Sequence, residues 1–412
     1  MSGRRVGFYL SDKKRRRMNL DAFADFCAGH GVEVVEIDLT QPLLGPFDVI
    51  VHKLSDVIVE AEHDSQSQQL LANFQSYVSA HPSTVLLDPL PAMTQLLDRF
   101  ASYRIMSKLH SSLQDWHICS PPYLEIHSAS DLSSIQQAVM TQGLSFPLIC
   151  KTRVAHGSLS HEMSLIFSAG SLVDIHPPCV LQSFINHGAV LHKVFVVGDR
   201  HFSVERPSLK NFPSGPCDRK TIFFNSHQVS KPESSSDLTA MDEQIPCLPP
   251  PSSEAVAALV RELRVQLGMA LFGVDVIINI QTHTLTVIDI NIFPGTAAVQ
   301  THTERHGDVL IHPSLYQAMR ECPSFSPVCS ATSSQCWTNR PLLSPRLLPL
   351  LSQHRLQVVH LLPAHLRNRS RTVLFHQLPR TNKPQFCFFT VDCTVARLCF
   401  NCNSKQLFIC NL

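Results

Sequence analysis

"VIDINIFPG", residues 287–295, is an apolar strand that contains an acid and an amide and closes in a Phe-Pro-Gly turn. Asp289 and Asn291 are two positions apart, so on a strand both side chains point to the face opposite Ile288 and Ile290. An unpaired carboxylate in so apolar a stretch would be costly to bury. The stretch therefore predicts a strand that presents a polar site.

A second acid precedes this strand in "LFGVDVIINI", residues 271–280. The two runs are separated by a short polar segment and predict paired strands, with Asp275 opposite Asp289 and Asn291. Oxygen ligands from these three residues, completed by water and phosphate oxygens, form the set that Mg²⁺ prefers. The alternative is a strand-end acid at Asp275 and a turn cap at Asp289.

Two lysines in the middle of the chain are candidates for binding phosphate. Lys151 ends the apolar strand "FPLICK", where its ammonium can reach a nucleotide, although a surface lysine is the alternative. Lys193 stands in "HKVFVVGD" where a strand normally has an apolar residue, and is otherwise explained as a charge that protects a strand edge. The alternation around Gly198-Asp199 predicts a hairpin. Between the lysines, the loop 152–163 could cover phosphates, but its histidines, His156 and His161, are also typical of an exposed loop.

The amino-terminal 110 residues predict an open α/β domain. Strands are expected at 4–10, 32–39, 47–54 and 83–90, with helices between them. "SDKKRRRMN", residues 11–19, directly follows the first strand, at the edge where open α/β sheets bind ligands. His52 and Lys53 lie at a neighbouring strand end. These basic residues favour a small, multiply phosphorylated ligand over a solvated helix start or an import signal, and the lack of interleaved aromatic residues argues against nucleic acid.

Composition and length limit the class of protein. The 412 residues are 44% hydrophobic and 16% charged, which is typical of a folded protein of two or three domains. There is no signal-peptide pattern and no run of 18 apolar residues, so we expect a cytoplasmic protein without a membrane segment. The phosphate-binding motif G-x-x-x-x-G-K-[ST], the kinase H-R-D motif and G-x-S-x-G are all missing from the sequence, so a nucleotide enzyme must use another scaffold.

The expected domain boundaries follow changes of pattern along the chain. We expect an amino-terminal α/β domain at 1–110, a small α+β lid at 111–205, a metal-binding domain at 206–295 and an atypical tail at 296–412. The tail carries 12 Lys+Arg against 4 Asp+Glu, whereas residues 1–295 carry 22 against 29. Prolines interrupt the tail every few residues, and we expect it to be poorly ordered.

Together these features resemble the ATP-grasp superfamily, and within it the inositol-tetrakisphosphate 1-kinase family, also called inositol 1,3,4-trisphosphate 5/6-kinase. The resemblance runs almost continuously from residue 4 to residue 295. Its matching stretches include "RVGFYLSDKK", "DVIVHKLSD", "LDPLPAMTQLLDR", "FPLICKTRVAHGSLSHEM", "VLQSFINHGAVLHKVFVVGD", "RPSLKNF", "FFNSHQVSKPESSS", "LFGVDVIIN" and "VIDINIFPG".

The resemblance implies an ATP-dependent kinase of soluble inositol polyphosphates. It would act as a monomer on inositol 1,3,4-trisphosphate at the 5- or 6-hydroxyl and on inositol 3,4,5,6-tetrakisphosphate at the 1-hydroxyl. The residues implied for the inositol phosphate are Lys14, Lys53, His161, Lys193, Asn291 and Gly295. Those implied for ATP are Arg99, Lys151, Gln182, Lys193, Ser208, Ser226 and Ser230. Asp275, Asp289 and Asn291 would hold two Mg²⁺ ions, and Lys151, Lys193 and Asp289 would be catalytic.

The chain departs from the family pattern after Gly295. The family continues into an amphipathic helix that packs on the metal-binding domain, and we expect "TAAVQTHTERHGDVLIHP" to replace that helix with a tail that has no fold of its own. A second hypothesis is therefore a catalytically weak isoform that binds inositol phosphates or a partner. A third, within the same superfamily, is a carboxylate-amine ligase, which would not need the basic run at 11–19.

Overall fold

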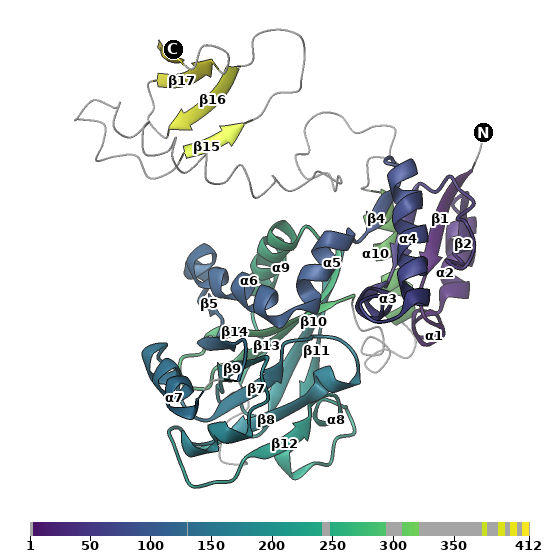
Figure 1. Ribbon diagram of the computed structural model, residues 1–412. Coiled ribbons are helices and arrows are strands. Elements are labelled where there is room, and N and C mark those ends of the chain that lie inside the picture. Colours follow the sequence, from purple (N-terminus) through teal and green to yellow (C-terminus); the bar gives the residue numbers. More distant parts are fainter. Residues whose placement is uncertain are drawn as a thin grey trace. The chain divides into compact units, whose positions relative to one another are not determined.

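The computed structural model describes residues 3–129, 131–240, 248–293 and 307–320, and four strands between residues 373 and 411. The chain divides into two compact units, residues 1–339 and residues 340–412. All candidate site residues that are described lie in the first unit, which contains three sheets (Figure 1).

The first sheet is parallel, and its strands have the order β2-β1-β3-β4. Its strands are β1 (Arg4–Tyr9), β2 (Val32–Glu36), β3 (Val49–His52) and β4 (Val85–Leu87). Its helices are α1 (Asp12–Met18), α2 (Leu20–Ala28), α3 (Ser55–Glu60) and α4 (Ser65–Ala80). Separate apolar clusters cover the two faces, as a buried parallel sheet requires. The predicted open α/β domain is confirmed.

The second sheet is antiparallel, has the order β12-β8-β7-β9-β6, and is called the lid sheet below. Helices α5 (Leu90–Leu97) and α6 (Arg99–Ser112) and the turn η1 (Gln114–Trp116) precede it. Its strands are β6 (Tyr123–Ile126), β7 (Leu148–Thr152), β8 (Glu162–Ile166), β9 (Cys179–Ser183) and β12 (Ile222–Asn225). Helix α7 (Leu132–Thr141) is amphipathic, and its buried apolar residues pack on this sheet. Short turns complete the region: η2 (Ser158–His161), η3 (Gly170–Asp174), α8 (Ser226–Val229) and η4 (Asp237–Thr239).

The third sheet has the order β11-β10-β13-β14-β5. Its strands are β10 (Val190–Val197), β11 (Arg200–Pro207), β13 (Leu271–Ile278), β14 (Leu285–Ile292) and β5 (Ile118–Cys119). Helix α9 (Ser253–Leu267) begins at Ser252, whose hydroxyl accepts from the backbone N–H of Ala255 at 3.1 Å. Its apolar face joins α6 and the strands in one core. Both predicted hairpins, β10–β11 and β13–β14, are confirmed.

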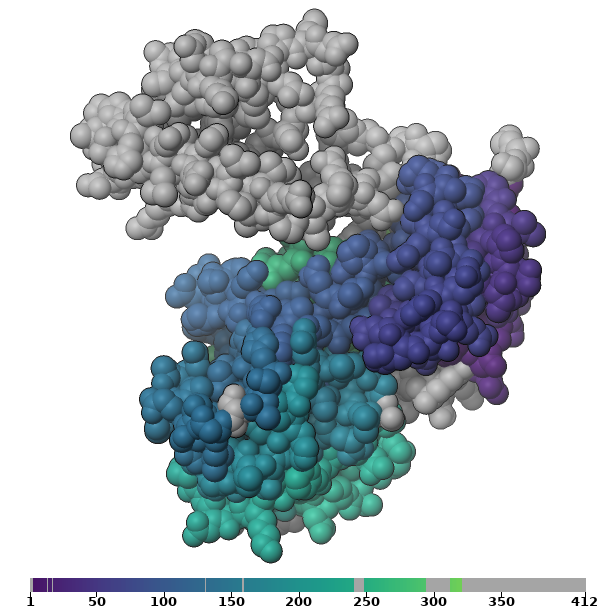
Figure 2. Space-filling model, viewed as in Figure 1, coloured from purple at the N-terminus to yellow at the C-terminus, as the bar shows by residue number. Residues whose placement is uncertain are grey.

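The sheets do not follow contiguous segments of the chain. The hairpin β10–β11, which we expected in the lid, pairs with β13, and β12 returns from the long connection at 207–252 to the edge of the lid sheet. The same connection also contains α8. The domain boundaries stay a prediction, although sheet pairing crosses the one at residue 205. In the space-filling view the purple and blue amino-terminal residues lie directly against the teal residues that follow (Figure 2).

Part of the tail contradicts the expectation drawn from the sequence. Helix α10 (Gly307–Arg320) is present, Leu315 and Met319 are buried in a core shared with β1, β3 and α2, and Ala318 is buried as well. Ala318 packs on Gly198, where a Cβ atom would lie only 2.8 Å from that of Ala318 and where φ is +62°. The expectation that no helix would pack after residue 295 was therefore wrong. The apolar spacing of Leu315, Ala318 and Met319 was the signal that it overlooked.

The second unit contains an antiparallel sheet whose strands follow sequence order. They are β15 (Val373–His376), β16 (Phe386–Val391), β17 (Ala396–Asn401) and β18 (Gln406–Asn411). The sequence did not predict these strands, and the prediction for the rest of the tail lies outside the described residues. Within the described part of the chain, every helix is too short or too polar to cross a bilayer.

Candidate functional site

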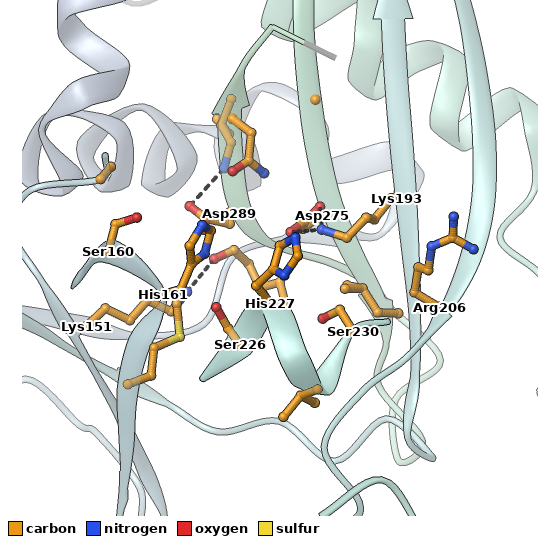
Figure 3. A pocket seen from close by; sticks show the side chains of 18 of the residues that line it. Lys151, Ser160, His161, Lys193, Arg206, Ser226, His227, Ser230, Asp275 and Asp289 are labelled. Carbon is orange, nitrogen blue, oxygen red and sulfur yellow. Dashed lines mark hydrogen bonds and ion pairs between the residues drawn. The ribbon is translucent and has the colours of Figure 1, made fainter. Parts of the chain in front are cut away.

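A cavity of about 830 Å³ lies among the three sheets of the first unit. The residues predicted for ligand, nucleotide and metal, with one exception, all line it, and Figure 3 labels several of them. These are Lys14, Lys53, Arg99, Lys151, His161, Gln182, Lys193, Ser208, Ser226, Ser230, Asp275, Asp289 and Asn291. The exception, Gly295, lies outside the described residues. The structure thus brings together residues that are up to 277 positions apart, although their individual roles stay predictions.

One wall of the cavity, called the strand wall below, consists of Lys193 on β10, Asp275 on β13, and Asp289 and Asn291 on β14. Lys193 is directly opposite Asp275, and Asp275 is directly opposite Asp289. Asn291 is opposite Gly273, two positions before Asp275. The predicted pairing of the two acid-bearing strands is confirmed, and strand register alone places these side chains on one face.

The charges of the strand wall compensate one another. The Nζ of Lys193 donates to Oδ1 and Oδ2 of Asp275 at 3.0 and 2.9 Å, and the two side chains are 26% and 15% exposed. Oδ1 of Asp289 accepts from the backbone N–H of Ile290 at 3.1 Å. Among the described residues, no group of three His, Cys, Asp or Glu side chains could hold a metal by itself. The set of two carboxylates and one amide fits Mg²⁺ only when phosphate or water oxygens complete the coordination.

Lys151 lies beside the strand wall and is almost completely buried, at 4% exposed. Its Nζ donates to the carbonyl oxygen of Ile288 at 3.0 Å and lies 5.4 Å from the centroid of the Tyr103 ring. Burial lowers the pKa of Lys151 to about 8, although the carboxylate of Asp289 opposes the shift. An anion in the cavity would stabilise this ammonium, as the prediction of a phosphate-binding lysine requires.

Gln182 offers a hydrogen-bond donor to the cavity. The side chain is 2% exposed, and its Oε1 accepts from the hydroxyl of Tyr103 at 2.9 Å. Its buried Nε2 has no hydrogen-bond partner in the described structure. Such an unpaired donor is costly unless a ligand satisfies it. This observation supports a nucleotide base as its partner. Tyr103, whose hydroxyl holds the Gln182 side chain in place, was not predicted from the sequence.

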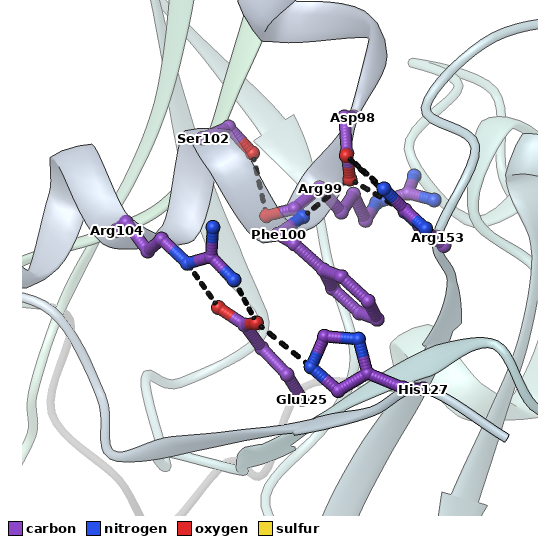
Figure 4. A network of polar contacts seen from close by, with 8 residues as sticks. All are labelled: Asp98, Arg99, Phe100, Ser102, Arg104, Glu125, His127 and Arg153. Atoms are coloured by element: carbon purple, nitrogen blue, oxygen red, sulfur yellow. Dashed lines mark hydrogen bonds and ion pairs between the residues drawn. The ribbon is translucent and has the colours of Figure 1, made fainter. Parts of the chain in front are cut away.

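Arg99, which follows Asp98 at the start of α6 (Figure 4), contacts the loop over the cavity through Nη1 and Nη2 of its guanidinium group. Its Nη1 donates to the carbonyl oxygens of Thr152 and Val154 at 2.6 and 3.2 Å, and its Nη2 donates to that of Ser160 at 2.9 Å. Nearby, Asp98 pairs with Arg153 at 2.7 Å. Arg99 therefore holds the 152–160 loop in place, and its predicted contact with ATP stays a prediction.

The predicted serines and histidines come from three separate segments. Ser208 Oγ and His187 Nε2 form a hydrogen bond of 2.8 Å, while Ser226 and Ser230 flank the short helix α8. The rings of His161 and His227 have centroids 5.5 Å apart (Figure 3). Burial lowers the pKa of His161, and the neighbouring His227 lowers it further. His227 was missed because the 207–252 connection showed no recognisable period.

A second part of the cavity lining is called the assembled wall below and consists of Lys14, Lys53, Asp56 and His156. Lys14 is on α1, Lys53 follows β3, Asp56 is on α3 and His156 is in the loop after β7. Tyr9 and His52, at the ends of β1 and β3, are paired across the sheet, which confirms the predicted neighbouring strand ends. Asp56 forms an ion pair with Nε2 of His156. The acid was overlooked although it stands only three residues after Lys53.

Two buried residues join the assembled wall to the strand wall, and His52 is one of them. We grouped His52 with the basic cluster, but it is fully buried, and its Nε2 hydrogen-bonds to the carbonyl oxygen of Asp88 at 2.7 Å. The carboxylate of Asp88 accepts from the backbone N–H groups of Ala270 and Leu271 at 2.7 and 2.9 Å. The end of β4 is thereby fixed to the beginning of β13, which carries Asp275.

Comparison with protein families gives two matches along the first unit. Residues 5–93 match the inositol 1,3,4-trisphosphate 5/6-kinase pre-ATP-grasp domain, and residues 112–312 match the ATP-grasp domain of the same family. The second match continues into α10, beyond the point at which the sequence resemblance was expected to end.

Curated relatives are similar over most of the chain. Inositol-tetrakisphosphate 1-kinase of Danio rerio is 50% identical over 317 residues, which cover 76% of this chain and 79% of that protein. The Xenopus laevis protein of the same name is 52% identical over 302 residues, covering 73% and 76%. Inositol-tetrakisphosphate 1-kinase 3 of Oryza sativa subsp. indica is 36% identical and covers 78% and 85%. Among solved structures, D-cycloserine synthetase DcsG aligns with 77% of this chain and its own full length at a TM-score of 0.48 and 12% identity, which is too distant to bear on function.

Proposed function

Because this chain belongs to the inositol 1,3,4-trisphosphate 5/6-kinase family of ATP-grasp proteins and is an inositol polyphosphate kinase, we propose its detailed reaction as follows. It transfers the γ-phosphoryl group of ATP to the 5- or 6-hydroxyl of inositol 1,3,4-trisphosphate and to the 1-hydroxyl of inositol 3,4,5,6-tetrakisphosphate. The ring oxygen forms a bond to the γ-phosphorus, the bond to the bridging oxygen of ADP breaks, and the hydroxyl proton is released to solvent.

The observation that supports this proposal most directly is the distribution of charge in one cavity. Lys151 and Lys193 line it together with Asp275 and Asp289, and Lys14 and Lys53 line it from the first sheet's segments. Phosphoryl transfer between two polyanions requires cations around both and little covalent chemistry. A cavity lined by four lysines and a carboxylate pair suits a nucleotide and a phosphorylated acceptor.

On the nucleotide side, each residue has a contact that supports its proposed role. The buried ammonium of Lys151 binds the phosphates, and the unpaired Nε2 of Gln182 donates to the adenine ring. Ser208, Ser226 and Ser230 provide hydroxyl groups along the same cavity. Arg99 acts through the 152–160 loop, whose backbone it holds over the phosphates.

Asp275, Asp289 and Asn291 would hold Mg²⁺, which neutralises the charge of the β- and γ-phosphates when it is bound. In the described structure, Lys193 donates two hydrogen bonds to the carboxylate of Asp275. We propose that Lys193 leaves this carboxylate for a phosphate oxygen when nucleotide and metal enter. The ion pair keeps both charged side chains satisfied until then, because neither would be stable alone in so buried a position.

On the acceptor side, Lys14, Lys53 and His161 bind the inositol phosphate groups and present one ring hydroxyl to the γ-phosphorus. Lys193, Asn291 and Gly295 complete the acceptor site in this proposal. In a loose transition state the bond from the hydroxyl oxygen to phosphorus has barely formed, so the oxygen gains little positive charge and positioning matters more than a strong base that removes the proton.

Incubation of the full chain with Mg-ATP and either inositol phosphate tests the proposal. We expect one added phosphate per inositol, measured by anion-exchange chromatography, with the ring position assigned by phosphorus NMR. Substitution Asp289→Asn provides the inactive control. Binding of inositol phosphate without turnover by the unchanged chain would reject the kinase proposal and favour a binding isoform. Formation of an amide from a carboxylate and an amine would favour a ligase.

We also propose that the protein is a cytoplasmic monomer that binds neither nucleic acid nor membranes. The reaction requires only soluble small molecules, and every residue assigned to it comes from one chain. Light scattering during size-exclusion chromatography tests the oligomeric state, and cell fractionation tests the location.

A further inference from the structure

Asp56 is an acidic residue in a wall where every other proposed ligand contact is cationic. It stands in the first turn of α3, three residues after Lys53, and lines the cavity together with Lys14 and His156. Its side chain is 48% exposed, so a ligand can reach it. A carboxylate in a site for polyanions weakens their attraction and therefore needs a reason.

The surroundings of Asp56 keep it ionised. The hydrogen bond from His156 is the largest cause that lowers the pKa of Asp56, and Lys53 and Lys14 lower it further. His156 contacts Oδ1, and within the described residues this carboxylate accepts no other hydrogen bond. Asp56 is consequently a charged acceptor with remaining capacity, in contact with the space assigned to the inositol phosphate.

A carboxylate distinguishes the two kinds of substituent on an inositol phosphate ring. It accepts a hydrogen bond from a free hydroxyl, but it repels a phosphate, which carries almost two negative charges at neutral pH. Rejecting the wrong ligand by a like charge is a general means of specificity, and its cost in affinity for the right ligand is small where that ligand offers a donor.

We propose that Asp56 is a specificity-determining residue that accepts a hydrogen bond from a free ring hydroxyl of the inositol phosphate and excludes a phosphate from that ring position. The inference rests on the proposed function of the same cavity. It adds that the cationic wall, besides attracting phosphates, rejects ligands that carry a phosphate at one particular ring position.

A simpler role for Asp56 would be to anchor the 152–160 loop through His156. In that case the loss of either partner would have the same effect on all ligands. In the specificity role the two losses differ, because Asp56 itself repels the phosphate, whereas His156 only hydrogen-bonds to Asp56.

The test compares inositol 1,3,4-trisphosphate with inositol hexakisphosphate, which has no free hydroxyl and must place a phosphate next to Asp56. The trisphosphate is followed by kcat/KM and the hexakisphosphate by its inhibition constant. We expect Asp56→Asn to improve inhibition by hexakisphosphate at least about tenfold relative to trisphosphate turnover, because the amide no longer repels a phosphate while its oxygen still accepts a hydrogen bond. Asp56→Ala should gain the same inhibition but lose trisphosphate turnover.

Two controls separate local exclusion from the general field of the protein. Glu60→Gln removes the same charge from an exposed position on the same helix that does not line the cavity, and it should leave the selectivity unchanged. Repeating the comparison at about 0.5 M salt screens distant charges, so a selectivity change that persists is local. His156→Asn should leave the selectivity unchanged or strengthen the exclusion of hexakisphosphate.

The inference is overturned if Asp56→Asn alters the ratio less than twofold, or if Asp56→Asn and His156→Asn alter it equally in the same direction. Failure of the unchanged chain to phosphorylate the trisphosphate would instead reject the proposed function. The selectivity is then read from the affinities of both inositol phosphates by calorimetry, to which the same two criteria apply.

Discussion

The strand wall and the assembled wall of the cavity are built in different ways. In the strand wall, Lys193, Asp275 and Asp289 occupy facing positions on three neighbouring strands, so backbone pairing fixes their distances. In the assembled wall, Lys14, Lys53 and Asp56 come from a helix, a strand end and another helix, and His156 comes from the lid loop.

The difference has a physical consequence for each wall. A strand pair specifies which side chains meet, and neighbouring opposite charges such as Lys193 and Asp275 stabilise that pairing. The assembled wall depends on contacts between segments far apart in the chain. Asp88, after β4, accepts a hydrogen bond from the residue before β13, and α10 packs on the first sheet. Changes in the strand wall should therefore lower the rate of phosphoryl transfer. Changes in the connecting contacts should lower the stability of the fold or displace the two walls relative to each other.

The largest effect is expected when the strand wall loses a carboxylate. Asp289→Asn keeps the shape of the side chain but removes the charge that offsets Lys151 and supports the metal. We expect kcat to fall about 10²–10³-fold, as when one electrostatic contact to a transition state is removed. Turnover of the trisphosphate measures the effect. Asp199→Asn, at the exposed hairpin turn, is the matched control, and near-normal activity of Asp289→Asn would reject the assignment of Asp289.

The next largest effect is expected in α10, which contacts both β10 and α2. Leu315 is 1% exposed, and Leu315→Ala should lower the free energy of unfolding by about 2–5 kcal/mol, because it leaves a cavity in the shared core. Urea denaturation followed by fluorescence measures the change. Arg320→Ala, on the exposed side of the same helix, should stay within about 0.5 kcal/mol. Equal effects of the two substitutions would mean that α10 does not contribute to this core.

Asp88→Asn tests the contact between the walls. An amide retains one acceptor but places an N–H group against the backbone N–H of Ala270 or Leu271, so we expect a loss of about 1–3 kcal/mol of stability. Asp38→Asn is the matched control, because the carboxylate of exposed Asp38 also accepts two hydrogen bonds, both from Thr40. If the position of the assembled wall also depends on Asp88, KM for the inositol phosphate should rise more than KM for ATP. Identical unfolding curves for Asp88→Asn and the unchanged protein would contradict the prediction.

The pH dependence of ATP use should report Lys151. Burial lowers the pKa of this lysine to about 8, so the ammonium is present below pH 8 and is lost as the pH rises through that value. We expect kcat/KM for ATP to fall about tenfold between pH 7 and pH 9, in proportion to the protonated fraction. Lys151→Arg keeps its charge and should remove this decline. A decline of the same size in the arginine variant would assign the titration to another group.

The smallest effect is expected outside both walls. Arg104, 58% exposed, pairs with Glu125 on the lid sheet, and its Nε donates to Oε1 at 2.8 Å (Figure 4). An exposed ion pair contributes little, so Arg104→Ala should lower stability by about 1 kcal/mol or less and leave turnover unchanged. Thermal unfolding and the kinase assay measure both. A large loss of activity would extend the functional region to α6 beyond the cavity.

The order of polar and apolar residues was sufficient to predict the strand wall. Asp289 and Asn291 share a face because strand side chains alternate, and the hairpin signal placed Asp275 opposite them. Lys151 was recognisable because a charge at the end of a buried strand needs a partner. The position of His52 was not recognisable, because a histidine that bonds a buried carbonyl oxygen and one that binds an anion occupy the same kind of strand end.

The sequence by itself therefore determined the parallel first sheet, the two hairpins and the acids and lysines that strand periodicity places together. The tertiary structure alone decided that β10 and β11 join β13, that β12 joins the lid sheet, and that α10 completes a core begun by β1 and α2. It also decided that Asp56 and His156, a hundred residues apart, meet beside Lys53. The physical reason is that local periodicity fixes which face a side chain occupies, whereas only packing between distant segments fixes what that face meets.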